Sequence, residues 1–176
     1  MDVKQLDAIP EGELRELLVA CCGAPAWVAA MLSARPFGSR ERLLAAADGA
    51  WAALPGEAIA DAIARHPRLG ESRARAWPAL PGGRPSTRER AWSAGEQAGA
   101  GDDESQARAE LARGNAEYER RFGHTFILCA TGLSGADMVR ALRERLGNDP
   151  ATERAVTARE LHRITRLRLE KLLAGA

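Results

Sequence analysis

Hydrophobic residues recur along most of the chain at intervals of three and four, the spacing of a helix that buries one face. From about Glu11 to Cys22, for example, the leucines at 14, 17 and 18 share a face, and Gly23 is placed to end the helix. The same reading, together with prolines and capping residues, predicts further helices. They span about 25–35, 40–54, 57–66, 87–98, 103–121, 135–146 and 151–173.

Residue usage supports this helical interpretation. The chain has 36 Ala and 20 Leu but only five Val and five Ile, so helix formers dominate and a sheet would lack its usual residues. The run TFILCA at 125–130 is the only β-like stretch, and one isolated strand cannot form a sheet. We therefore predict an all-α fold of eight to nine helices, in a single domain over residues 1–176, with an extended buried connector near 125–130.

Charge and cysteine usage narrow the class of protein. Twenty-five Lys and Arg against 24 Asp and Glu give a net charge of +1, so no strong field attracts nucleic acid or anionic lipid. No apolar run approaches the roughly 18 residues of a membrane span, and the first ten residues lack the features of a secretory signal. The three cysteines have no metal-binding spacing. We expect a cytoplasmic protein with reduced thiols, no metal site, and neither a nucleic-acid nor a membrane partner.

A stretch rich in glycine, proline and arginine follows His66, over residues 68–85, and shows neither helical nor strand periodicity. Structureless loops of this length in a compact domain are usually functional or disordered, so the stretch hints at a nearby site. The sequence does not tell whether residues 71–85 form a lid.

Three features could carry chemistry. His66 lies where a helix meets a proline, so it is either a general acid or a helix-end histidine bonded to carbonyls or water. Ser93, Glu96 and Gln97 share one helix face, which is either a polar site or a solvated surface. Arg168 falls on the apolar stripe of the last helix, so it is either a structural ion-pair partner or a ligand for a carboxylate substrate.

Several short segments then occur in a characteristic order and spacing. They are HPRLGE at 66–71, WSAGEQAG at 92–99, NAEY at 115–118, RFG at 121–123, FILCA at 126–130, RLGN at 145–148 and ITRLRL at 164–169. Each is weak alone, but together, over about residues 6–173, they resemble the 2-oxo-4-hydroxy-4-carboxy-5-ureidoimidazoline (OHCU) decarboxylase family.

The resemblance implies an all-helical lyase without a cofactor, usually a homodimer, that decarboxylates a small ureidoimidazoline substrate to (S)-allantoin in the last step from urate to allantoin. It assigns catalysis to His66 and Glu96, and our hypothesis is that His66 is the proton donor, assisted by Glu96. It assigns substrate binding to Pro67, Ser93, Ala94, Gly95, Glu96, Gln97, Phe126, Ile127, Leu128, Cys129, Ala130 and Arg168.

Three residues depart from the family pattern. His124 and Thr125 stand where other members often carry Phe-Pro, and Gly114 replaces an apolar residue.

The alternatives to the enzyme hypothesis are a non-catalytic helical dimerisation or binding module and a related small-molecule lyase on the same scaffold. The enzyme hypothesis requires His66, Glu96 and Arg168 to face a common pocket.

Overall fold

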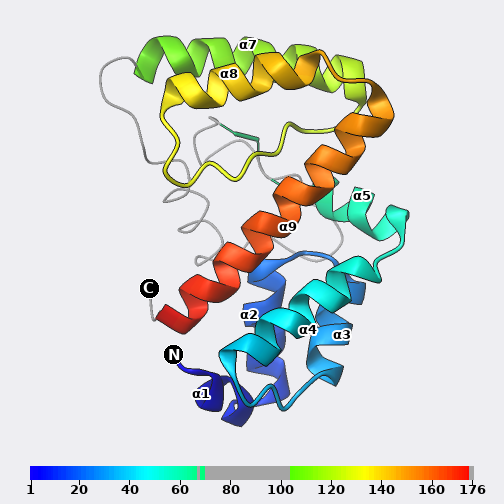
Figure 1. The fold of residues 1–176 in the computed structure, drawn as a ribbon, viewed down its shortest axis with the longest axis vertical. Coiled ribbons are helices and arrows are strands. Elements are labelled where there is room, and N and C mark those ends of the chain that lie inside the picture. The colour runs from blue at the N-terminus through cyan, green and yellow to red at the C-terminus, as the bar shows by residue number, and fades with distance from the viewer. Residues whose placement is uncertain (67, 70–103, 175–176) are drawn as a thin grey trace. The chain divides into compact units, whose positions relative to one another are not determined.

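The computed structural model describes residues 1–66, 68–69 and 104–174, and all the regular secondary structure of these residues is helical (Figure 1). The helices are α1 (Val3–Ala8), α2 (Glu11–Cys21), α3 (Pro25–Ser33), α4 (Arg40–Ala52), α5 (Gly56–Ala64), α7 (Glu104–Phe122), α8 (Gly135–Leu146) and α9 (Pro150–Ala174). The all-α prediction is confirmed. The predicted helix 87–98 and most of the 68–85 loop lie outside the described residues.

Capping residues set the starts of several helices. Ser39 caps α4 by accepting a hydrogen bond from the Arg42 N–H, and Ser134 and Asp137 form a capping box at α8. Helix α1 was not predicted, although Asp2 and Gln5 form a capping box there too. Six residues are too few to display helical periodicity, so only the cap could have revealed this helix.

The described chain forms two compact units. The first contains residues 1–62 and α9 from residue 162 onward, and the second contains residues 63–161. The prediction of one domain over the whole chain stays a prediction.

In the first unit, α3 packs against both α2 and α4. Its core is built around Trp27, which is fully buried and donates its indole N–H to the Ala47 carbonyl at 3.2 Å. The end of α9 belongs to this unit, where Arg166 forms an ion pair with Asp48 of α4 at 2.5 Å. Segments from both ends of the sequence therefore build one core.

In the second unit, α7 and α8 lie side by side and run in the same direction (Figure 1). Ala107 lies against Gly135, and Gly114 lies against Leu142, so both helices advance together along the sequence. Parallel neighbours need a connection that returns along the helix pair, whereas a short loop joins antiparallel ones.

Residues 123–134 make this return. Within them, residues 125–130 have no regular secondary structure, and Phe126, Ile127 and Ala130 are buried. The predicted buried connector is confirmed, and its physical reason is the parallel arrangement of α7 and α8.

Candidate active site

His66 lies just beyond the last residue of α5, in the second unit. Its backbone N–H donates to the Ile63 carbonyl at 3.0 Å, which closes the final turn, and its side chain is half-buried. The predicted helix reached His66, but α5 ends at Ala64. The residue before a proline is disfavoured in the helical region, which accounts for an end ahead of Pro67.

The chain after His66 is anchored on α7. Arg68 donates to the Glu119 carboxylate from two nitrogens, one at 2.6 Å, and the Asn115 amide donates to the Leu69 carbonyl at 2.8 Å. The Leu69 side chain belongs to a buried cluster that also contains Phe126 and Ala130. Leu69 and the connector therefore share one hydrophobic core, so residues 68–69 lie beside the connector.

The other two histidines have structural contacts. The His124 ring lies edge-on to Tyr118, with 5.5 Å between ring centroids, and its Nδ1 is 3.2 Å from the Thr125 carbonyl. In the first unit, His162 stacks on Trp51 at 5.1 Å and forms an ion pair with Asp48 at 3.0 Å when protonated. These contacts place both rings against neighbouring side chains, although Nε2 of His124 is buried without a hydrogen-bond partner among the described residues. His66 stays the candidate that the resemblance indicates.

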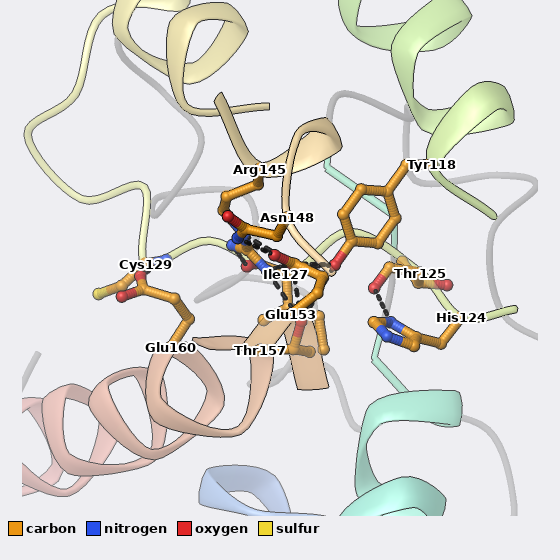
Figure 2. A network of polar contacts seen from close by, with 10 residues as sticks. All are labelled: Tyr118, His124, Thr125, Ile127, Cys129, Arg145, Asn148, Glu153, Thr157 and Glu160. Carbon is orange, nitrogen blue, oxygen red and sulfur yellow. Dashed lines mark hydrogen bonds and ion pairs between the residues drawn. The ribbon is translucent and has the colours of Figure 1, made fainter. Parts of the chain in front are cut away.

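Two side chains hold the backbone of the connector (Figure 2). Arg145, from the last turn of α8, donates to the Ile127 carbonyl at 2.5 Å. Glu160, from α9, accepts a hydrogen bond from the Cys129 N–H at 3.0 Å. The segment that the resemblance assigns to substrate binding is thus held by one buried cation and one buried anion.

Arg145 is the centre of a buried polar network (Figure 2). Its Nε donates to the Glu153 carboxylate at 2.8 Å, and its Nη2 donates to the Thr157 hydroxyl at 2.8 Å. The guanidinium also lies 4.5 Å from the centroid of the Phe126 ring. Tyr118 donates its hydroxyl to Glu153, and Asn148 donates its side-chain amide to Glu153 at 2.6 Å. Buried charges are tolerated when paired and hydrogen-bonded in this way.

The network fixes the protonation of its members. Burial raises the pKa of Glu153, but hydrogen bonds from Arg145, Tyr118 and Asn148 outweigh it, so the pKa lies below its ordinary value. Burial, reinforced by the hydrogen bond to Glu153, raises the pKa of Tyr118 far above its ordinary value. Glu153 is therefore an anion and Tyr118 a neutral donor near neutral pH.

Arg168 is buried in α9, in the part of that helix that belongs to the first unit, as its helical phase predicted. Its Nη1 lies 3.4 Å from the Ala20 carbonyl. Its charge also acts on Cys22, where burial raises the pKa of the thiol and the nearby cation opposes that rise. Both predicted roles, structural partner and substrate ligand, stay open.

Part of the predicted site lies outside the described residues, namely Pro67, Ser93, Ala94, Gly95, Glu96 and Gln97.

Among the residues that the structure does describe, no group of three or more His, Cys, Asp or Glu side chains is placed to bind a metal ion. No described helix is long and apolar enough to cross a membrane. The common pocket required of His66, Glu96 and Arg168 stays a prediction.

Sequence reasoning missed the residues that hold the connector. Glu153, Thr157 and Glu160 are buried on α9 at spacings of four and three, in phase with Leu161 and Ile164 on the same helix. The helical phase that places Arg168 on the buried face also places these three residues there, nearer the start of the helix. In the same way Arg145 follows Leu142 by three positions on the buried face of α8.

Two curated relatives match over 65 residues, or 37% of this chain. The uric acid degradation bifunctional protein TTL of Arabidopsis thaliana is 45% identical there, and the 2-oxo-4-hydroxy-4-carboxy-5-ureidoimidazoline decarboxylase of Amia calva is 40% identical. The matched part is 20% and 37% of the lengths of these relatives, so the chain covers well under two thirds of either.

Two solved structures share the fold. A crystal structure of OHCU decarboxylase in the presence of (S)-allantoin matches with a TM-score of 0.71 and 26% identity, over 90% of this chain and 98% of that one. A crystal structure of (S)-allantoin synthase matches with a TM-score of 0.67 and 17% identity, over 97% of this chain and 54% of that one. The family model of OHCU decarboxylase matches residues 7–170, and the chain therefore belongs to the OHCU decarboxylase family.

Proposed function

We propose that the protein decarboxylates 2-oxo-4-hydroxy-4-carboxy-5-ureidoimidazoline to (S)-allantoin without a cofactor, as the last step from urate to allantoin. The observation that carries the proposal is the family match over residues 7–170. It is supported by the likeness to an OHCU decarboxylase crystallised in the presence of (S)-allantoin, which extends over 98% of that chain.

The reaction breaks the bond between the ring and its carboxyl carbon, releases CO2 and leaves the electron pair in the ring system. One proton must then reach one face of the ring to give a single enantiomer. We assign His66 as the donor of this proton and Glu96 as its assistant, which also orients the substrate hydroxyl. A half-buried imidazole beyond a helix end suits this task, since the helix carbonyls favour its protonated form.

Substrate binding falls to the remaining predicted residues. Ser93, Gln97 and the peptide groups of residues 126–130 would hold the ring and ureido edges, together with Pro67, Ala94 and Gly95. Arg168 would contribute a charge-assisted contact that binds and orients the substrate. A tight grip on the departing carboxylate would stabilise the ground state as much as the transition state, so we give Arg168 no part in the chemical step.

The expected homodimer and cytoplasmic location belong to the same proposal. The homodimer rests on the resemblance, and the location rests also on the three cysteines, whose number and spacing fit no disulfide framework. Light scattering coupled to size-exclusion chromatography measures the mass of the assembly, and a mass of one chain would contradict the homodimer.

The test of the function is turnover of freshly generated substrate by the wild-type protein and by His66→Asn. We expect His66→Asn to lose about 10²- to 10⁴-fold in kcat and to lose the enantiomeric excess of the allantoin, because solvent then supplies the proton from either face. Substrate decay and optical rotation are followed together.

The matched control is His162→Asn, which removes the histidine stacked on Trp51 in the first unit. It is expected to keep stereospecific turnover. Stereospecific turnover at the wild-type rate in His66→Asn would remove His66 from the mechanism. An inactive wild-type protein would refute the proposed function and favour the non-catalytic alternative.

A further inference from the structure

The connector is held at two backbone groups two residues apart. The Ile127 carbonyl accepts from Arg145 at 2.5 Å, and the Cys129 N–H donates to Glu160 at 3.0 Å. The side chains of Arg145 and Glu160 come from different helices, α8 and α9, and both residues are buried. Figure 2 shows them meeting the connector at these two neighbouring points.

Leu128 lies between the two held groups and is only partly buried. In the part of the chain that the structure describes, neither its N–H nor its C=O forms a hydrogen bond. Each residue other than proline carries one backbone donor and one backbone acceptor, and at Leu128 both are left able to bond with a ligand. A ureido or imidazolinone edge offers the matching acceptor and donor.

Glu160 is a costly residue at its position. A carboxylate that is about 6% exposed loses most of its hydration, and such groups are retained where charge-assisted hydrogen bonds compensate. The hydrogen bond that Glu160 accepts from the Cys129 N–H offsets part of this lost hydration, and it joins Glu160 to the backbone of the connector. An apolar side chain would fill the same space at less cost but would leave this N–H without its acceptor.

We propose that Glu160 is a positioning residue for substrate binding, which holds the connector at Cys129 so that the Leu128 N–H and C=O stay aligned with the substrate. The inference rests on the proposed function, because it takes residues 126–130 as part of the substrate site. In this proposal Glu160 acts through the backbone of the connector, by its hydrogen bond with the Cys129 N–H, and not on the reacting atoms.

Three substitutions at position 160 separate the effect of side-chain length from the effect of side-chain charge. Glu160→Gln keeps an acceptor oxygen in place without the charge, and we expect kcat and KM close to wild type. Glu160→Leu removes the acceptor, and Glu160→Asp keeps the charge but shortens the reach. Both should raise KM about tenfold or more with a smaller change in kcat, since a slightly misplaced binding group loses at least that much.

The control for lost stability is Leu43→Ala, at a fully buried position of α4 in the first unit. It should lower stability and leave KM unchanged. A wild-type KM in Glu160→Leu and Glu160→Asp, or an equal rise of KM in Leu43→Ala, would overturn the proposal. Equal loss of kcat in Glu160→Gln and Glu160→Leu would overturn it too, since the charge itself would then act in catalysis.

A second measurement does not depend on activity. Amide hydrogen exchange at Cys129, followed by NMR, should be slow in wild type and Glu160→Gln and clearly faster in Glu160→Leu and Glu160→Asp. Unchanged exchange in the last two variants would show that Glu160 does not hold the connector. If the wild-type protein shows this protection but does not turn over the substrate, the proposed function fails while the backbone contact stands.

Discussion

Arg145 and Glu153 form an ion pair that is almost removed from solvent, with side chains 9% and 0% exposed. A second arginine of α8, Arg143, pairs with Glu110 at 2.7 Å but is 69% exposed. The same pairing chemistry has different consequences in these two places. Solvent can replace a lost partner at the surface, whereas a charge left alone in the interior has no substitute.

Arg145→Met is therefore expected to lower the free energy of unfolding by about 3–5 kcal/mol, because it leaves the Glu153 carboxylate without its cation. The double variant Arg145→Met with Glu153→Leu should lose less than the single one, since no charge is then stranded. Urea unfolding followed by circular dichroism measures both.

Arg143→Met is the matched control on the same helix and should cost less than about 1 kcal/mol. A loss in Arg145→Met no larger than in Arg143→Met would show that the buried network contributes little to stability.

Among the helices, the parallel pair α7 and α8 depends on a close approach at Gly114. A Cβ added there would lie 2.4 Å from Cδ2 of Leu142, which is buried and cannot move without disturbing the core. This contact gives a physical reason for glycine at position 114. Gly49, inside α4, has nothing within 4 Å of an added Cβ.

The two glycines should respond in opposite ways to alanine. Alanine is favoured over glycine inside a helix by up to about 1 kcal/mol, so Gly49→Ala is expected to stabilise the protein. Gly114→Ala should destabilise it by a net of about 1 kcal/mol or more, because overpacking of the core exceeds that gain. Thermal and urea unfolding of the pair measure the difference, and stabilisation by Gly114→Ala would contradict the close packing of α7 on α8.

In the molecule as a whole, residues far apart in sequence complete each core. The first unit joins the N-terminal helices to the end of α9, which supplies the buried residues Ile164, Leu169 and Leu172 and forms surface ion pairs such as Arg166 with Asp48. The second unit joins α7, the connector and α8 to the start of α9 through Glu153. Removal of the Glu153 charge therefore affects the stability of the fold and not only one local contact.

This network should make stability depend on acid pH. The pKa of Glu153 is lowered in the folded protein, so its contribution is present above its unfolded value of about 4.3 and is lost as pH falls through the folded pKa. Urea unfolding at a series of pH values from about 7 to about 3 should show stability falling at the acid end, with a smaller slope in Glu153→Gln. Equal slopes in the two proteins would contradict this assignment.

Much of the fold followed from local pattern. Helical periodicity and the caps at Ser39 and Ser134 gave α4 and α8 nearly to the residue, because these signals act within one or two turns. The pattern missed α1, which is shorter than two turns, and ended α5 two residues late. Of the candidate site, the sequence located His66 at a helix end, the buried connector and the inward Arg168, and the ordered motifs indicated the family.

The sequence by itself determined most of the described helices, the connector and the chemical identity of the candidate residues, because periodicity, capping and residue type are properties of short segments. Only the tertiary structure revealed that α7 and α8 run parallel, that the connector must return between their ends, and that Arg145 and Glu160 hold its backbone. Contacts of this kind join residues 18 and 31 positions apart, and whether two such side chains reach one peptide depends on how the helices pack rather than on any local pattern.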